Sequence, residues 1–378
     1  MGGSKLCSPG AKLALLAALA VGCGATGGER PAGAPAATAP SSQPPAGVNA
    51  TGAQPTSASS RGAVPAAGTP TASSCAGSSC APGPGAAAVA GATHFPPPAF
   101  EPSFAHTAQP SDGQWAPYPD GTAPGDAVMF RSLVHPDAIK RFVFVIVIAI
   151  DLSRTELRLV AGTDEPDTKE VPAERRTGLV PESDWPAALA VFNGGFMAKH
   201  GKHGMKIGAD LFVPPRDDAC TIAIGRDGGL RIRSWPAVAA SEGELAAYRQ
   251  VPPCLVEQGK LNLELPSETV HRRWGAAEDG KRDVRRTALC LDQSGSVLLY
   301  GYGDYIMAAQ LAQGMQRAGG YDCTELDINW SYTRFFPVDH STTPPALGPS
   351  FVEKLEYSKQ SYFTKPYFKD FFYLRRKR

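Results

Sequence analysis

The chain has 378 residues, a formal net charge of +1 at pH 7, and 43% hydrophobic and 19% charged residues. This length could hold two or three domains. The near-neutral charge provides no basic field of the kind that nucleic-acid-binding proteins use, so we expect no nucleic-acid partner. The composition changes sharply along the chain and divides it into three parts.

The first 22 residues are typical of a secretory signal peptide. Lys5 and Lys12 precede an apolar run at 13–20 that is too short to span a bilayer, and small residues follow it. The Val-Gly pair directly before Cys23 resembles a bacterial lipobox. This resemblance implies cleavage before Cys23, lipidation of its thiol and a lipid-anchored protein of the bacterial cell envelope. Plain secretion, with Cys23 incidental, is the alternative.

Residues 23–125 are predicted to be a disordered linker. They are rich in Ala, Pro, Gly, Ser and Thr, poor in aliphatic residues, and show no sustained apolar period. Such a segment cannot bury enough apolar surface to offset the entropy of ordering its backbone. We expect several aromatic side chains near its end to contact the domain that follows: Phe95, Phe100, Phe104, Trp115 and Tyr118.

Residues 126–378 are long and apolar enough for a single globular domain. In its first half, strands are expected at 141–150, 156–161, 187–192, 209–213, 221–224 and 230–234, with the first two forming a hairpin. A helix is expected at 241–249, where Ser241 and Glu244 have the spacing of a capping box.

The second half of the domain continues this pattern. Strands at 287–292 and 296–301 are expected to pair across a short polar turn, and a helix at 305–318 is expected to end at Gly319. A strand containing Asp327 follows. Because strands outnumber helices, the predicted fold class is α+β, with strand-rich mixed sheets and a few helices.

The domain contains four cysteines, Cys220, Cys254, Cys290 and Cys323. An even number in an exported protein permits two disulfides in any of three connectivities, and buried free thiols are the alternative. The wide spacing lacks the close cysteine pairs of a zinc site, so we expect no metal. No phosphate-binding loop or dinucleotide motif is present, and we expect no cofactor.

The segment 325–329 is the strongest candidate for a functional site. In a strand, Glu325, Asp327 and Asn329 would line one face, while Leu326 and Ile328 would fill the other. If the two carboxylates lie close together, their repulsion raises one pKa and places an acid beside a base. An ordinary half-exposed strand with a wet face is the alternative, because alternation reports burial rather than chemistry.

A second candidate follows the strand at 187–192. Asn193 precedes Gly194 and Gly195, and glycines directly after a strand let a ligand approach the backbone N–H groups closely. In the alternative interpretation, Asn193 only stabilises a tight turn through its side chain.

Four segments, in this order, resemble the phosphodiester glycosidase domain family. Residues 192–196 are similar to its NGGFF segment, 254–260 to PLLVxDGK, 286–289 to the start of RTAVG, and 308–327 to the helix and strand that lead to the family's Asp. The resemblance extends over residues 128–340 and covers most of the domain.

The chain departs from the family pattern around this Asp. Ile328, Asn329 and Trp330 stand where the family has three glycines, and Glu325 stands where it usually has Asn. Three large residues in place of glycines put bulk where the substrate would approach the backbone, so the pocket must be reshaped, filled or moved. Ser331 retains the family's residue in register.

The resemblance implies cleavage of the bond between a sugar's anomeric carbon and a phosphate oxygen. In this reaction Asp327 is the catalytic carboxylate, Glu325 assists it, and the Arg286 guanidinium holds the phosphate. Alternatively, Arg286 belongs to a solvated strand edge. The expected substrate-binding residues are Asn193, Gly194, Gly195, Asn329 and Ser331.

Together these features predict an exported glycoside hydrolase that cleaves sugar-1-phosphodiester bonds in an envelope or extracellular glycan. Its partners would be a phosphorylated carbohydrate or glycolipid and, through the lipid anchor, a membrane, and we expect a monomer. The alternative is a non-catalytic surface lipoprotein that binds a phosphorylated glycan in the same cleft, since fold carries over to relatives more reliably than function.

Overall fold

The architecture is known for most of the chain after residue 94. The computed structural model describes residues 95–119, 124–267, 269, 271–352 and 354–377. The predicted signal peptide, Cys23 and the predicted linker up to residue 94 lie outside the described residues. Along the described segments, no helix is both long enough and apolar enough to cross a membrane.

The described strands form three sheets. The largest has eight strands in the order β1 (Ala116–Pro117), β2 (Met129–Val134), β3 (Val145–Asp151), β14 (Val297–Ile306), β13 (Val284–Leu291), β15 (Asp322–Ile328), β11 (Val256–Glu257) and β12 (Lys260–Leu261). The second has the order β7 (Asp210–Val213), β6 (Met205–Ile207), β10 (Leu245–Val251), β8 (Cys220–Gly225) and β9 (Leu230–Ser234). The third has the order β17 (Ala346–Leu347), β16 (Phe335–Asp339), β5 (Ala188–Asn193), β18 (Phe371–Arg376) and β4 (Thr155–Val160).

Helices are few and short. The α-helices of the described chain are α1 (Trp235–Val238) and α2 (Ala308–Arg317). Short 3-10 helices occupy Pro124–Asp126, Ala173–Arg175, Glu182–Ala187, Ala198–His200, Ala239–Glu244 and His271–Trp274. The predicted strand-rich α+β class is therefore confirmed. The paired strands are all antiparallel, however, whereas mixed sheets were predicted.

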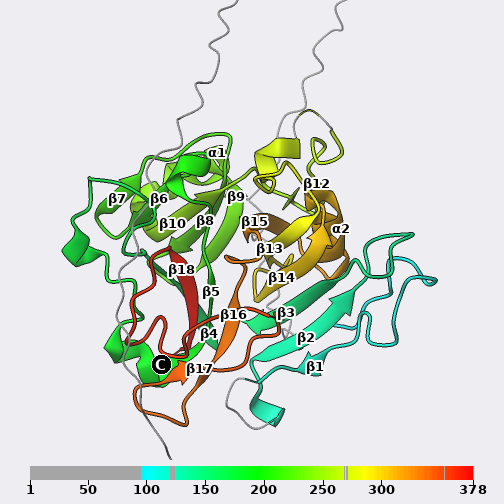
Figure 1. Cartoon of the computed structure of the whole chain (residues 1–378), viewed down its shortest axis with the longest axis horizontal. Coiled ribbons are helices and arrows are strands. Elements are labelled where there is room, and N and C mark those ends of the chain that lie inside the picture. The colour runs from blue at the N-terminus through cyan, green and yellow to red at the C-terminus, as the bar shows by residue number, and fades with distance from the viewer. Residues whose placement is uncertain (1–94, 120–123, 268, 270, 353, 378) are drawn as a thin grey trace, which may run out of the picture. The chain divides into compact units, whose positions relative to one another are not determined.

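Apolar side chains from all three sheets meet in one core. Ile148 of β3, Ile222 of β8 and Phe192 of β5 belong to the same buried cluster. A second cluster fills the space between the eight-stranded sheet and α2, where Leu311 and Met315 are fully buried. Figure 1 shows α2 beside β13 and β14, the strands it contacts. Because β3 is buried along its whole length, it reads as a continuous apolar run in the sequence.

The predicted hairpin of the first two strands is wrong. The turn at 152–154 carries the chain from β3 in the eight-stranded sheet to β4 in the third sheet, where β4 pairs with β18. Because β2 and β14 occupy both edges of β3, no edge of β3 remains for β4. The sequence predicts the two strands but not their different partners.

The predicted helix at 241–249 is also wrong. Residues Ala239–Glu244 form a 3-10 turn, and Leu245–Val251 form β10, which is hydrogen-bonded between β6 and β8. Ser241 does not cap a helix, since its hydroxyl donates to the Val238 carbonyl oxygen at 2.8 Å. Strand pairing on both edges, together with burial of Tyr248 and Arg249, outweighs the local helical pattern.

The four domain cysteines form two disulfides, as their even number permitted. Cys220 pairs with Cys254, and Cys290 pairs with Cys323. The second bridge joins residues that face each other on the neighbouring strands β13 and β15. It therefore fastens the strand that carries Asp327 to the centre of the sheet.

The segment 95–119 packs against the domain through the aromatic residues noted in the sequence. Phe100 and Trp115 form an edge-to-face pair and contact the cluster beneath α2, while Tyr118 is buried in the main core. A buried contact joins Asp112 Oδ1 of this segment to His135 Nδ1 at 2.9 Å, and the His135 backbone N–H donates to Asp112 Oδ2 at 3.1 Å. This segment precedes Asp126, the predicted start of the domain, and is ordered on its surface.

Candidate functional site

The strand that carries Asp327 is buried on both faces. All seven residues of β15 are inaccessible or nearly so, which excludes the half-exposed strand with a wet face. Glu325 and Asp327 share one face, as alternation predicts. Asn329 lies beyond the strand end with a φ of 74°, so it belongs to a turn and not to that face.

Glu325 forms a buried ion pair with Arg286 of β13. The Arg286 Nη1 atom lies 2.6 Å from Glu325 Oε1, and the two side chains are 2% and 0% exposed. The remaining N–H groups of this guanidinium donate to four backbone carbonyl oxygens, those of Ile306, Trp274, Gly275 and Arg282. All five donors of Arg286 are thus taken, and none is left for a phosphate. The predicted phosphate-binding role and the alternative of a solvated strand edge both disagree with this geometry.

The environment of Glu325 opposes its ionisation. Burial raises the pKa of its carboxyl to about 7, although Arg286 acts in the opposite direction. Within the described structure, Oε2 has no hydrogen-bond partner. A buried carboxylate oxygen without a donor favours the protonated form, so the surroundings of Glu325 stabilise its neutral carboxyl.

We expect Glu325 to make the protein less stable as pH rises from about 4.5 to about 7. Its folded-state pKa lies above its unfolded value, so the native state holds the proton more tightly, and this stabilisation is lost through that window. The expected loss is on the order of 2 kcal/mol. Urea unfolding near both pH values measures it. Glu325→Gln retains an acceptor for Arg286 without titrating, so the pH dependence should weaken; an unchanged dependence would assign it to other groups.

Asn193 joins three strands and contacts no open space. Its Nδ2 donates to Thr287 Oγ1 at 2.9 Å and to the Gly194 carbonyl oxygen at 3.3 Å. Its Oδ1 accepts from the Tyr300 hydroxyl at 3.1 Å and from the Arg334 backbone N–H at 3.0 Å. The side chain is 3% exposed and saturated, so these contacts give it the structural role rather than the substrate-binding one.

Gly194 and Gly195 approach a charged group of the protein itself. The Gly195 N–H donates to Asp370 Oδ2 at 3.0 Å, and the Gly194 N–H donates to the Asp370 carbonyl oxygen at 3.2 Å. A Cβ on Gly194 would lie 2.1 Å from that carboxylate, and a Cβ on Gly195 would lie 2.8 Å from the Arg249 guanidinium. Close backbone approach is therefore the reason for both glycines, but Asp370 occupies the amides that were predicted to bind substrate.

Asp370 belongs to a second buried pair. Arg249 Nε and Nη2 bind its two carboxylate oxygens at 2.8 and 3.2 Å, and both side chains are almost fully buried. The other Arg249 donors reach backbone oxygens of Phe196, His203 and Gln250. This fork-like pairing fixes the loop after β5 to the segment that enters β18.

Asp327 pairs with Lys369, the residue before Asp370. Lys369 Nζ contacts Asp327 Oδ2, and Asp327 Oδ1 accepts from the Ile328 N–H at 2.9 Å. Burial raises the pKa of Asp327 to about 6, against the opposing effect of Lys369. The same ammonium lies 4.1 Å from the ring centre of Tyr332, a cation–π contact. Asp327 is therefore mostly ionised at neutral pH, beside a cation that itself lies against an aromatic ring.

A hollow of about 630 Å³ has Tyr332 in its wall. It is lined by Ala277, Glu278, Asp279, Lys281, Asp283, Val284, Arg285, Asp304, Tyr305, Asn329, Trp330, Ser331 and Tyr332. Two predicted substrate-binding residues, Asn329 and Ser331, thus lie at a real depression, whereas the other predicted site residues do not line it. Trp330 is 65% exposed, so it lines the hollow without sealing it.

The walls of the hollow are polar and aromatic. Trp330 and Tyr305 are each 65% exposed, and Tyr305 has a φ of 51°. Such conformations are uncommon for large residues and occur often at ligand sites. Four carboxylates and two cations line the same space, and one of these carboxylates, Asp304, pairs with Arg285 at 2.8 Å. This combination suits a neutral polyhydroxylated ligand, whose hydroxyls and apolar ring face both find partners.

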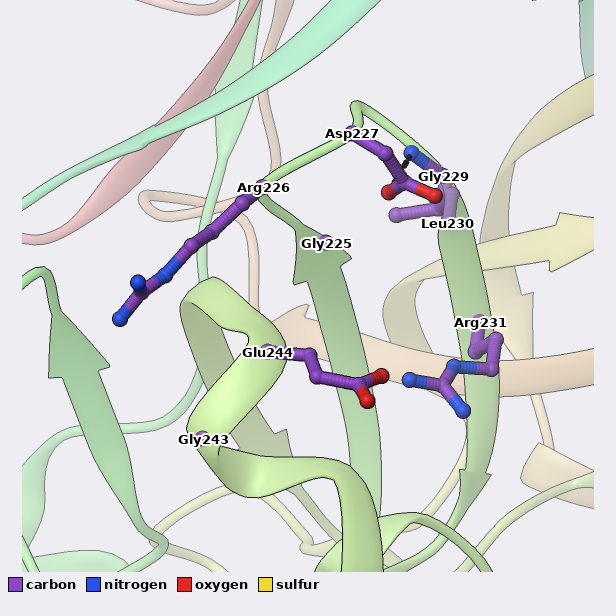
Figure 2. Close-up of a pocket in the computed structure, with 8 residues that line it drawn as sticks. All are labelled: Gly225, Arg226, Asp227, Gly229, Leu230, Arg231, Gly243 and Glu244. Carbon is purple, nitrogen blue, oxygen red and sulfur yellow. Dashed lines mark hydrogen bonds between the residues drawn. The ribbon is translucent and has the colours of Figure 1, made fainter.

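Another hollow of about 660 Å³ lies at the turn between β8 and β9 (Figure 2). Asp227 accepts from the Gly229 N–H at 2.9 Å and so stabilises the turn itself. Figure 2 shows Arg226 pointing away from Asp227 and Glu244 pointing toward Arg231. None of the predicted site residues lines this hollow, and two of its glycines, Gly225 and Gly229, belong to the hairpin turn.

Metal ligation finds no support among the side chains whose positions are described. Within those ranges, no group of three or more His, Cys, Asp or Glu side chains could hold an ion. His203, in the loop before β6, is partly buried, and burial lowers its pKa to about 3.

No sequence motif marks four residues that contact or neighbour the site: Lys369, Asp370, Arg249 and Tyr332. A signal was available for two of them, because Lys369 and Asp370 interrupt an apolar and aromatic run at 367–374. Lys369 and Asp370 are adjacent opposite charges in a buried segment directly before a strand. Each needs a partner there, which points to buried ion pairs. The identity of those partners, Asp327 and Arg249, has no local signature.

Comparisons with known proteins give distant likenesses only. No family model matches the chain, and no curated protein matches it. The catalytic domain of zebrafish N-acetylglucosamine-1-phosphodiester alpha-N-acetylglucosaminidase, auto-inhibited by its pro-peptide, is 14% identical with a TM-score of 0.42, over 70% of this chain and 87% of that one. A hypothetical protein from Synechocystis is 11% identical with a TM-score of 0.37, over 66% and 62%. A putative exported protein from Burkholderia pseudomallei is 10% identical with a TM-score of 0.25, over 62% and 74%.

Proposed function

We propose that the chain is an exported glycoside hydrolase that cleaves sugar-1-phosphodiester bonds in an envelope or extracellular glycan. In this proposal Asp327 is the catalytic carboxylate, and Lys369 takes the role first predicted for Arg286. The observation that carries the proposal is the Asp327–Lys369 pair directly behind Tyr332, a residue that also lines the hollow. An anion and a cation next to Tyr332, a wall residue of a ligand-sized hollow, match the two charges that develop in this reaction.

The hollow would receive the sugar. The exposed rings of Trp330 and Tyr305 offer apolar surfaces to a sugar face, and Asp283 and Asp304 offer acceptors to its hydroxyls. Lining carboxylates outnumber cations, so the phosphate itself would lie toward Lys369 rather than at the hollow's centre. Access to the ion pair passes the half-buried side chain of Tyr332.

The reaction assigns each group one task. The bond between the anomeric carbon and the phosphate oxygen breaks, the hydroxyl of a water molecule goes to that carbon, and the remaining proton ends on the phosphate monoester. The ionised Asp327 stabilises positive charge at the anomeric carbon, either electrostatically or by attacking it. Lys369 stabilises the negative charge of the departing phosphate.

Turnover is the test of this proposal. The purified chain is incubated with sugar-1-phosphodiesters that differ in the sugar, and release of free sugar is measured beside an Asp327→Asn preparation. Release by the parent chain and not by the variant supports the assignment. If neither protein releases sugar from any member of the series, the hydrolase assignment is overturned.

A second candidate is a surface protein that binds a phosphorylated glycan or glycolipid without cleaving it. The observation that favours it is the burial of the ion pair, since Asp327 is 4% and Lys369 3% exposed. A protein of this kind would show saturable binding of the phosphodiester, measured calorimetrically, without release of sugar.

Export through the signal peptide 1–22, lipidation at Cys23 and a location on the bacterial cell envelope belong to the same proposal. Two disulfides in the domain are compatible with an oxidising compartment. Incorporation of labelled palmitate by the parent and not by Cys23→Ser would support the anchor, and equal labelling of both would contradict it. The chain is proposed to act as a monomer.

A further inference from the structure

The loop between β2 and β3 ends in an exposed apolar and basic segment. Residues 138–142, here called the tip, are all exposed, whereas His135 and Val143 on either side are buried. Ile139 is 87% and Phe142 63% exposed, and the charged Lys140 and Arg141 lie between them. Exposing large apolar side chains to water is energetically unfavourable, and this cost is removed when another surface covers them.

The tip is held in place by hydrogen bonds at its base. Asp137 Oδ1 accepts from the backbone N–H groups of Ile139 and Lys140, both at 2.8 Å. Gln310 of α2 donates to the other Asp137 oxygen, and the Val143 N–H donates to the Lys140 carbonyl oxygen at 3.1 Å. A tip ordered in this way presents its side chains without a further ordering cost on binding.

A neighbouring segment extends the same surface. His106 Nε2 lies 2.5 Å from the Ala138 carbonyl oxygen, and the His106 ring lies 6.2 Å from that of Phe104, which is 37% exposed. Asp137 is the acidic residue of the loop itself, and its oxygens are engaged by Gln310 and by the backbone. The outward charge of the tip therefore comes from Lys140 and Arg141.

We propose that the tip docks onto an anionic lipid surface, with Ile139 and Phe142 entering the interface and Lys140 and Arg141 facing lipid phosphates. Basic residues beside exposed apolar ones match the charge and polarity profile of such a surface. A stable protein partner would require a contact of about 800 Å² on each side, which is large for a five-residue tip. This contact is separate from the lipid proposed at Cys23.

The tip and the hollow lie at the same end of the strands of the eight-stranded sheet. Register places Val145 opposite Val134 and Gly303, and Gly303 opposite Arg286, which in turn faces Ile328. The strand ends that carry the tip and the turn after Asp327 are thus three strand spacings apart, about 15 Å. Docking of the tip would bring this end of the sheet to the lipid surface. The docking itself does not depend on catalytic activity.

Vesicle flotation tests the docking. The probe is the full chain carrying Cys23→Ser, so that no lipid is attached there, mixed with vesicles of phosphatidylglycerol and phosphatidylethanolamine or with neutral phosphatidylcholine. Ile139→Asn with Phe142→Asn should lower the partition constant on the anionic vesicles at least about tenfold. Lys140→Glu with Arg141→Glu should lower it on anionic vesicles and not on neutral ones.

Leu263→Asn is the matched control, since Leu263 is 94% exposed elsewhere on the surface and its loss should leave binding unchanged. Thermal unfolding of each variant checks that the fold is intact. Failure of the parent to float, or equal flotation of the Ile139/Phe142 variant, overturns the proposal. So does a parent that elutes as a dimer while that variant elutes as a monomer, because a second copy would then cover the tip.

Discussion

Replacing Arg286 with Met should lower the free energy of unfolding by about 3–5 kcal/mol. The change leaves the Glu325 carboxylate buried without its cation and removes the donors of four backbone carbonyl oxygens. Uncompensated buried charge is costly, because water cannot reach it to replace the lost partner. Urea denaturation of parent and variant at the same pH measures the difference.

Two further variants separate this role from a general effect of losing an arginine. Arg285→Met removes a partly exposed pair with Asp304, so it should cost at most about 1 kcal/mol. Combining Arg286→Met with Glu325→Leu removes both charges of the buried pair and should recover much of the loss. An Arg286→Met protein that is as stable as the parent, but impaired in phosphate binding, would restore the role first predicted from the family resemblance.

Asp327→Asn should reduce kcat on a sugar-1-phosphodiester by about a hundredfold to ten-thousandfold. Asn has the same shape but carries no negative charge to stabilise the anomeric centre. The parent should also lose kcat/KM as pH falls below about 6, because Asp327 must be ionised and burial raises its pKa to about 6. Initial rates across pH measure both effects, with unfolding curves confirming that the variant is folded.

Lys369→Met provides the companion measurement. Removing the ammonium beside Asp327 should raise the pKa of that carboxyl further, so the acidic limb of kcat/KM should move to higher pH. Asp218→Asn, which changes an exposed carboxylate that pairs with Arg216 and does not line the hollow, serves as the control and should keep the parent profile. Undiminished turnover by Asp327→Asn would remove Asp327 from the mechanism.

Much of the fold was predictable because its signals are local. The apolar run of β3, the strand β9 and the helix α2, which ends two residues before Gly319, all appear in the sequence at nearly their observed positions. Predictions failed where a distant partner decided the outcome. Residues 245–251 have a local helical pattern, yet β6 and β8 offer two hydrogen-bonding edges, and pairing on both sides outweighs the weak preference of a short segment.

At the candidate site, too, the local sequence predicted some features, and distant partners decided the others. Alternation along β15 correctly puts Glu325 and Asp327 on one face, but each carboxylate has its own cation, Arg286 for one and Lys369 for the other. Lys369 lies 42 residues away along the chain, and no spacing rule links it to Asp327. The glycines after β5 predicted a close approach, and only the structure shows that the approaching group is Asp370.

By itself the sequence determined the strand-rich periodicity, an even set of domain cysteines, and the placement of Glu325 and Asp327 on one face of a strand. The tertiary structure alone decided how the charges are shared, since Arg286 and Asn193 are saturated inside the core while Asp327 meets Lys369 behind Tyr332. The physical reason is range. The periodicity of burial depends on residues that are close together in the sequence. The partner of a buried charge, by contrast, is whichever group the folded chain brings within hydrogen-bonding distance, however far away it lies in the sequence.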